Sequence, residues 1–235
     1  AYRMLFGHRP HVLRPGQNVL IWGASGGLGS YAVQLCAVAG ANAIGVVSEP
    51  DKFDFVMSMG AKGVINRKDF NCWGQLPKVN SPEFNDYMKE ARKFGKAVWQ
   101  HTGGKDVDIV FEHPGEATMP VSVFVVKRGG MVVICAGTTG FNLTMDARFL
   151  WVRQKRVQGS HFANLLQASQ ANQLMIERRL DPCMSEVFPF KDIPEAHEKM
   201  LDNKHLPGNM AVLVTSPKPG LRTVEDVLDA GRASA

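Results

Sequence analysis

Short apolar runs alternate along the chain with amphipathic stretches that are long enough to form helices. The runs of strand length cover residues 18–23, 43–47, 63–66, 107–111, 131–136, 156–159 and 210–215. The helical stretches cover residues 27–39, 51–59, 117–126, 164–178 and 193–201. Continuous Val and Ile runs separated by helices are typical of a parallel sheet that is buried on both faces. The pattern therefore predicts an α/β fold, with a doubly wound parallel sheet of the Rossmann type.

The same pattern divides the chain into regions. Residues 1–17 are expected to be the end of a helix begun elsewhere and a linker, residues 18–216 a dinucleotide-binding domain, and residues 217–235 a C-terminal tail. Residues 70–102, between the third and fourth expected strands, exceed the roughly dozen residues that a crossover needs. We interpret them as an insertion, which is either functional or a surface decoration.

Charge and cysteine content narrow the function classes. The 235 residues carry a formal net charge of +5, which either attracts nucleotide or acyl-CoA phosphates or reflects a mildly basic surface. The basic residues are scattered, so no nucleic-acid partner is expected. No apolar run of about 18 residues occurs, so no membrane span is expected. The four cysteines form no Cys-x-x-Cys pair, which predicts no metal site and favours reduced thiols in a cytoplasmic protein.

A glycine-rich segment, GASGGLG at residues 23–29, directly follows the first expected strand and opens a helix. Glycines allow a tight turn and a close approach of the backbone to a pyrophosphate, and the helix N-terminus presents free N–H groups to it. We therefore predict that Ser25, Gly26, Gly27 and Leu28 bind the phosphates of a dinucleotide. The glycine spacing differs from a strict G-x-G-x-x-G.

The end of the second expected strand bears on the choice of cofactor. An NAD site usually places a carboxylate there to bind the ribose 2′-hydroxyl. Here the strand ends at Ser48, Lys52 follows one helical turn later, and Arg67 follows the third strand. A hydroxyl and two cations suit a 2′-phosphate and predict NADPH, whereas Glu49 is the one feature that favours NAD. Ser48 has a helix N-cap as its alternative role.

Three more segments follow the carboxyl ends of strands, where open parallel sheets bind ligands. His113 in FEHPG either binds a substrate oxygen or water, or is a loop histidine held by Pro114. Gly137 and Thr138 either cradle the nicotinamide amide with backbone groups or form a flexible connection. His161, three residues before Asn164, is expected to belong to the capping segment of the next helix.

The segments GQNVLIWGASGGLGSYAVQL, VVSEPDK, INRKDF and RGGMVVICAG resemble the medium-chain dehydrogenase/reductase superfamily, in its quinone-reductase branch. The insertion NCWGQLPKVNSPEFNDYMKEARKFGKAVWQ, with DIVFEHPGEA and QKRVQGSHFANLLQA, is more similar still to the crotonyl-CoA carboxylase/reductase family. Ordinary quinone reductases lack this insertion and have no histidine at the FEHPG position. The resemblance covers nearly the whole chain.

This resemblance implies NADPH-dependent reduction of a 2-enoyl-CoA, with the resulting enolate trapped by CO2. It carries the role of holding CO2 over to His113, and it implies a homo-oligomer without catalytic zinc. Members of the family also have an N-terminal GroES-like catalytic domain, which is absent from this sequence, so the isolated chain is expected to fold without normal turnover. The alternatives are a plain enoyl-CoA or quinone reductase, and a non-catalytic NADPH-binding module.

Overall fold

The computed structural model describes residues 1–216 and 218, and the chain divides into two compact units. The first unit comprises residues 1–181 and the second begins at Pro182. The tail predicted at residues 217–235 lies outside the described residues, apart from Lys218. In the described part, no helix is both long enough and apolar enough to span a bilayer.

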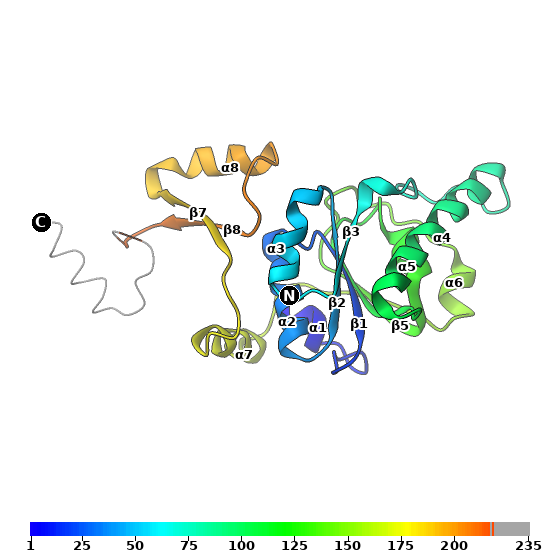
Figure 1. Cartoon of the computed structure of the whole chain (residues 1–235), viewed down its shortest axis with the longest axis horizontal. Coiled ribbons are helices and arrows are strands. Elements are labelled where there is room, and N and C mark those ends of the chain that lie inside the picture. Colours follow the sequence, from blue (N-terminus) through cyan, green and yellow to red (C-terminus); the bar gives the residue numbers. More distant parts are fainter. Residues whose placement is uncertain (217, 219–235) are drawn as a thin grey trace, which may run out of the picture. The chain divides into compact units, whose positions relative to one another are not determined.

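A six-stranded parallel sheet forms the centre of the first unit (Figure 1). Its strands are β1 (Asn18–Trp22), β2 (Asn42–Val47), β3 (Gly63–Asn66), β4 (Val107–Glu112), β5 (Val126–Ile134) and β6 (Arg156–Gly159). Their order is β3-β2-β1-β4-β5-β6, so the winding direction reverses between β1 and β4. The predicted doubly wound parallel sheet is confirmed.

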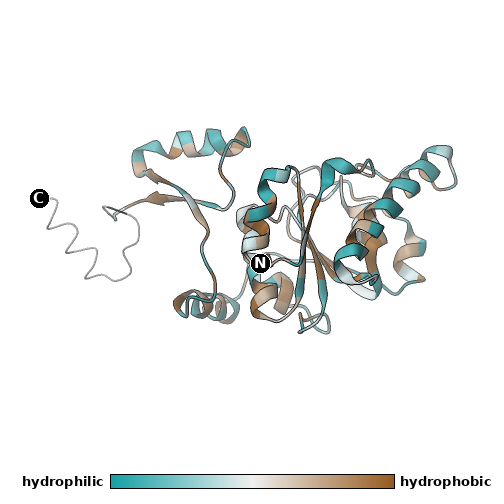
Figure 2. Cartoon of the chain, in the orientation of Figure 1, coloured by the Kyte–Doolittle hydropathy of each residue, from teal (hydrophilic) through white to brown (hydrophobic). Residues whose placement is uncertain are grey.

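Helices cover both faces of this sheet. They are α1 (Tyr2–Phe6), α2 (Gly27–Val38), α3 (Phe53–Ser58), α4 (Pro82–Thr102), α5 (Met119–Val125), α6 (Ala147–Trp151) and α7 (Leu165–Ile176), with 3-10 turns at Pro50–Lys52 and Arg67–Asp69. Alternate strand residues enter two different cores. Val19 and Ile21 pack on the face of α2 and α3, whereas Leu20 and Trp22 pack on the face of α4 and α5. Both faces of the sheet are therefore buried under helices. This explains the continuous apolar runs in the sequence, which appear as hydrophobic strands in Figure 2.

The segment that we predicted to be an insertion contains a regular structural element. The hydroxyl of Ser81 accepts the N–H of Phe84 at 3.2 Å and starts α4, and Gly103, with φ of 67°, ends it. Six side chains of α4 are buried: Phe84, Tyr87, Met88, Ala91, Phe94 and Val98. The Phe94 ring stacks on the buried Trp22 ring at 5.6 Å. Residues 82–102 are thus the crossover helix that covers the sheet, and only the loop at 70–81 exceeds a plain crossover.

The second unit contains a small parallel sheet of its own. Its elements are β7 (Met184–Pro189), a 3-10 turn (Phe190–Asp192), α8 (Ile193–Leu201) and β8 (Asn209–Leu213). We expected the strand near residues 210–215 to be the last strand of the main sheet, and this was wrong, because it pairs with β7. The sequence pattern did not predict β7, because most of its residues are only partly buried and do not form a clear apolar run. The other predicted domain boundaries stay predictions.

Candidate functional site

The glycine-rich segment forms the turn between β1 and α2. The N–H of Gly26 donates to the carbonyl of Gly23 at 3.0 Å, and the first intrahelical bond runs from Ser30 N–H to the Gly26 carbonyl at 2.8 Å. The N–H groups of Gly27 and Leu28 precede that bond, and the first turn of α2 carries no acidic side chain. This helix N-terminus therefore has the donors and the positive dipole that a phosphate group needs.

Two of the glycines are required by close packing. A Cβ atom on Gly29 would lie 2.2 Å from the carbonyl oxygen of Gly23, so a side chain there would push the helix off the turn. Gly23 has φ of +57°, and its Cβ would lie 2.5 Å from Nε2 of His113. By contrast, a Cβ on Gly26 would meet only the Gly23 oxygen, at 3.5 Å. The spacing of Gly23 and Gly29 thus reflects how closely the turn, the helix and His113 pack.

The residues predicted for the 2′-phosphate lie at the ends of neighbouring strands. Val47 pairs with Asn66 in the β2–β3 register, so Ser48 and Arg67 follow at the same edge of the sheet. Lys52 ends the 3-10 turn that comes next, and it is half-buried, as is Arg67. Within the described residues, neither cation forms an ion pair with an acidic side chain. The structure thus brings these three residues to one edge.

Glu49, the one residue that favours NAD, is paired with a cation. Glu49 forms an ion pair with the ammonium group of Lys68, a residue that our sequence analysis did not consider. The alternative N-cap role of Ser48 is wrong, because the residue that caps the 3-10 turn is Glu49 and no side chain caps it. Lys68, a second cation directly after Arg67, was the feature of the sequence that could have indicated this ion pair.

His113 lies at the reversal point of the sheet, directly after β4. Its Nε2 lies 3.1 Å from the carbonyl oxygen of Trp22. Because a carbonyl only accepts, Nε2 carries the proton and the neutral ring keeps Nδ1 as an acceptor. Burial lowers the pKa of His113, so the neutral form prevails near pH 7. The ring is therefore held by the end of β1, next to the glycine turn.

Sequence analysis missed Glu112, the last residue of β4, which is fully buried. Its carboxylate accepts the hydroxyl of Thr118 at 2.7 Å and the N–H of Gly115 at 3.2 Å, and it also accepts the hydroxyl of Ser122. The indole N–H of Trp22 donates to the same Ser122 hydroxyl at 2.8 Å. Burial raises the pKa of Glu112 to about 7, although these donors act in the opposite direction. A charged residue that ends an apolar strand was the available signal.

Glu112 and His113 thus form one closed arrangement around Trp22. The carbonyl of Trp22 holds the imidazole, and its indole reaches Glu112 through Ser122. Glu112 in turn binds the backbone of the loop that follows His113. This network determines where the imidazole lies relative to the phosphate turn.

The loop containing Gly137 and Thr138 is fastened to the loop after His113. The N–H of Thr138 donates to the carbonyl of His113 at 3.3 Å, and the N–H of Thr139 donates to the carbonyl of Pro114 at 2.8 Å. The loop is therefore bonded to the neighbouring loop at two points, and its role beside the nicotinamide stays a prediction. The N–H of Thr138 already has a protein acceptor, so a nicotinamide amide would be held through other groups of this loop.

His161 lies apart from these groups. It is exposed, and its ring lies against the ring of Phe162, with centroids 3.8 Å apart. The predicted capping segment is confirmed at Asn164, whose side chain accepts the N–H of Gln167 at 2.8 Å in a capping box with that residue. We therefore leave His161 out of the candidate site.

The sheet order, the glycine turn and the position of both at the reversal point define a dinucleotide-binding domain of the Rossmann type. Residues 27–178 match the family model described as zinc-binding dehydrogenase, and the chain belongs to this family. Among the residues that the structure describes, no group of three His, Cys, Asp or Glu side chains is placed to hold a metal ion.

Individual relatives agree with this assignment. A crotonyl-CoA carboxylase/reductase of Cereibacter sphaeroides is 76% identical over 99% of this chain and 54% of its own length. A crotonyl-CoA reductase of Streptomyces avermitilis is 43% identical over 94% of this chain and 48% of its own length. The solved structure of the crotonyl-CoA carboxylase/reductase AntE in complex with NADP is 46% identical, with a TM-score of 0.90 over 92% of this chain and 54% of that one. The predicted resemblance is confirmed, and the chain spans about half the length of the curated relatives it matches.

Proposed function

We propose that this chain is the NADPH-binding portion of an enzyme that reduces and carboxylates a 2-enoyl-CoA, converting crotonyl-CoA and CO2 to ethylmalonyl-CoA. The proposal is supported by the groups that lie together at the carboxyl edge of the main sheet, near the point where the strand order reverses. This edge combines a glycine turn suited to a pyrophosphate with Lys52 and Arg67, two cations that form no ion pair within the described residues and that follow β2 and β3. The relative that is 76% identical bears the name of this activity, and AntE, in complex with NADP, supports the choice of cofactor.

The residues of this edge fit the cofactor. Ser25, Gly26, Gly27 and Leu28 would hold the pyrophosphate at the N-terminus of α2, because the packing of Gly23 and Gly29 leaves room for backbone approach. Ser48, Lys52 and Arg67 would hold the 2′-phosphate, and the loop with Gly137 and Thr138 would border the nicotinamide. The bound cofactor supplies a hydride to the β-carbon of the enoyl thioester.

A titration with both cofactors tests this assignment. NADPH should bind more tightly than NADH, and Lys52→Ala or Arg67→Ala should each cost about 1.5–3 kcal/mol of NADPH binding, because each removes a charge-assisted contact. Calorimetry measures both affinities. Lys89→Ala is the matched control, since it removes a cation on α4 that is paired with Asp86. Equal affinities for the two cofactors, or cation variants that behave like the control, would contradict the proposal.

His113 is the residue that we propose acts on CO2. Its neutral imidazole keeps Nδ1 as an acceptor for a water molecule that holds CO2, and its orientation is set by the carbonyl of Trp22. CO2 binds weakly, so a fixed partner that also keeps competing protons away favours capture of the enolate. The acyl-CoA pocket would be completed by the GroES-like domain, as the resemblance implies. The resemblance also implies a homo-oligomer, and the cysteine pattern favours a cytoplasmic protein.

Plain reduction without carboxylation is a second candidate, because the relative from Streptomyces avermitilis is named crotonyl-CoA reductase. The two candidates differ only in what the enolate captures at its α-carbon. Product analysis at saturating bicarbonate separates them, since proton capture gives butyryl-CoA and CO2 capture gives ethylmalonyl-CoA.

A further inference from the structure

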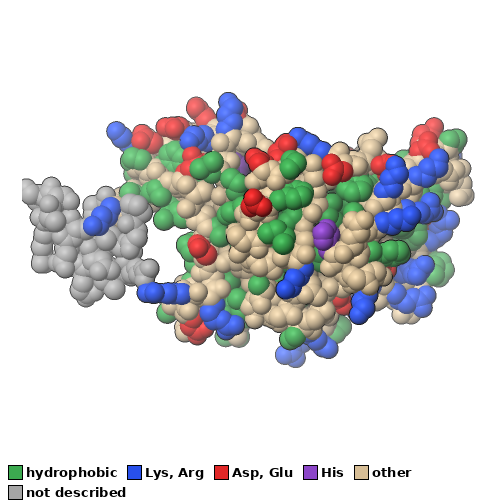
Figure 3. Space-filling view, in the orientation of Figure 1, with side chains coloured by type: hydrophobic (Ala, Val, Ile, Leu, Met, Phe, Trp, Pro, Cys, Tyr) green, Lys and Arg blue, Asp and Glu red, His purple; other side chains and the backbone are tan. Residues whose placement is uncertain are grey.

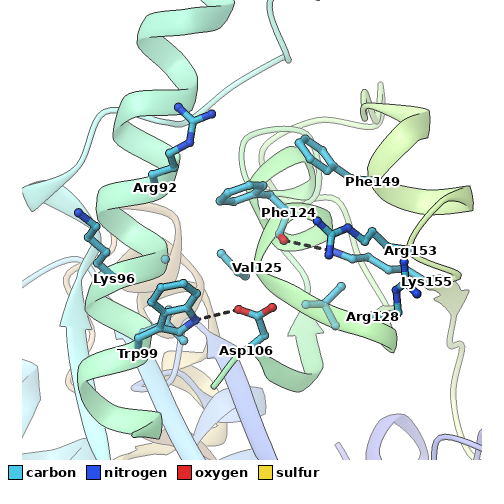
Figure 4. A pocket seen from close by; sticks show the side chains of 13 residues that line it. Arg92, Lys96, Trp99, Asp106, Phe124, Val125, Arg128, Phe149, Arg153 and Lys155 are labelled. Atoms are coloured by element: carbon cyan, nitrogen blue, oxygen red, sulfur yellow. Dashed lines mark hydrogen bonds between the residues drawn. The ribbon is translucent and has the colours of Figure 1, made fainter. Parts of the chain in front are cut away.

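We propose that the amino end of the main sheet carries a second anion site, which binds a nucleotide with two or more phosphates. A cavity of about 410 Å³ lies between the second half of α4, the start of β5 and the segment before β6. Five cationic side chains line it: Arg92, Lys96, Arg128, Arg153 and Lys155. In Figure 4, Arg92 and Lys96 come from α4 on one side, and Arg128, Arg153 and Lys155 lie on the other.

This cavity is separate from the candidate cofactor site that includes the glycine turn, Ser48, Lys52, Arg67 and His113, which we term the crevice. Asp106 directly precedes β4, Arg128 lies near the start of β5, and Lys155 directly precedes β6. In a parallel sheet these positions share the amino edge, whereas the glycine turn and His113 lie at the carboxyl edge. A ligand in the cavity therefore leaves the dinucleotide crevice open.

Most of the positive charge in the cavity is not neutralised. Asp106 is the one acidic lining residue, and it accepts the indole N–H of Trp99 at 2.8 Å. The Lys155 ammonium donates to the carbonyls of Val123 and Phe124, at 2.7 and 3.0 Å, and so closes the end of α5.

The other four cations are Arg92, Lys96, Arg128 and Arg153. In residues 1–216, their charged groups have no acidic partner and no hydrogen bond to the protein. Together these cations give the cavity a positive potential, which favours an anion with several charges. In Figure 3, Lys and Arg side chains gather on the side of the molecule that carries α4, α5 and α6.

Aromatic side chains decide which class of anion fits. The rings of Phe124 and Phe149 meet edge to face at 5.3 Å, and Trp99, which is 44% exposed, lies on the same cavity. A second cavity of about 410 Å³ adjoins the first and shares Arg92, Phe149 and Arg153 with it. Aromatic faces stack on a base, and Arg side chains bind phosphate oxygens in pairs. A nucleotide satisfies both, whereas an inorganic anion satisfies only the charges.

Calorimetric titration of ADP into the full chain tests the site, with excess NADPH present to occupy the crevice. ADP should still bind under these conditions, and inorganic pyrophosphate should bind at least fivefold more weakly because it has no ring to stack. The double variant Arg128→Ala/Arg153→Ala should weaken ADP binding at least tenfold. These side chains are exposed and unpaired, so circular dichroism should report an unchanged fold.

Lys89→Ala/Lys93→Ala is the matched control, because it removes two cations of α4 that pair with Asp86 and Glu90. It should bind ADP like the unmodified chain. No ADP binding in the presence of NADPH, or equal losses in both double variants, would overturn the proposal. Pyrophosphate binding as tightly as ADP would overturn the nucleotide class. NADPH titrated alone reports on the proposed function independently, so the two failures are distinguishable.

Discussion

The two proposed anion sites lie at opposite ends of the main sheet and would bind their ligands in different ways. At the carboxyl end, the donors are backbone N–H groups at the start of α2, fixed by the close packing of Gly23 and Gly29. At the amino end, the charges are the flexible side chains of Arg92, Arg128 and Arg153 around a cavity. Fixed backbone donors lose little entropy on binding, whereas long side chains lose up to about 2 kcal/mol each. Salt also screens exposed cations more strongly than buried dipoles. We therefore expect salt to weaken binding in the cavity more than binding at the glycine turn.

The largest expected effect concerns Glu112, the buried carboxyl group next to His113. Folding raises the pKa of Glu112 from 4.5 to about 7, so the folded protein keeps a proton that the unfolded chain has lost. This stabilisation is complete below pH 4.5 and disappears as the pH rises to about 7, by up to about 3 kcal/mol. Relative to Glu112→Gln, the unmodified chain should therefore lose that amount of stability between pH 4.5 and 7.

Urea unfolding at several pH values measures this difference. The variant Glu177→Gln, which changes an exposed carboxyl on the far end of α7, is the control. A stability difference between Glu112→Gln and the unmodified chain that is constant across this range would show that the buried carboxyl keeps its charge on folding. The carboxyl end of the sheet would then no longer differ from the amino end in having a buried group that titrates, Glu112, where the amino end has exposed cations.

The next prediction concerns Gly29→Ala, a variant that should disturb the crevice and leave the cavity at the amino end unchanged. Gly29→Ala places a Cβ 2.2 Å from a backbone oxygen, so it should destabilise the chain by about 2 kcal/mol and weaken NADPH binding. Gly26→Ala in the same turn meets only one atom at 3.5 Å and should cost less than about 1 kcal/mol. Thermal unfolding and NADPH titration measure both variants. If the two alanine variants have the same stability and the same NADPH affinity, the close packing of the turn does not determine cofactor binding.

The smallest effect sharpens the role of His113 within the crevice. In a chain that also carries the catalytic domain, His113→Asn should raise the ratio of butyryl-CoA to ethylmalonyl-CoA about tenfold, which corresponds to a change of about 1.4 kcal/mol between the two barriers. NADPH oxidation should fall much less, since the imidazole positions CO2 and not the hydride donor. Mass spectrometry of the products measures the ratio. His161→Asn, an exposed histidine against Phe162, is the matched control. Reduction and carboxylation falling together at a constant ratio would mean that His113 supports the fold or the cofactor.

Prediction from the sequence succeeded where a local pattern determines the structure. Residues 63–66 and 156–159 are strands as expected, and the glycine segment opens α2. It failed where the outcome depends on distant partners. The length of residues 70–102 suggested an insertion, but one apolar stripe of α4 is enough to cover the sheet. The strand near residue 210 was real, whereas its neighbour β7 could not be inferred from its own residues.

The sequence alone determined the doubly wound sheet and the phosphate turn, because both depend on the order of apolar and glycine residues along the chain. Only the tertiary structure decided that Lys68 pairs with Glu49, and that Trp22 links Glu112 to His113. It also brought Arg92 and Arg153 to one cavity from helices and loops that are 61 positions apart in the chain. Charges and hydrogen bonds act over a few ångströms in space, and separation along the chain does not reveal those distances.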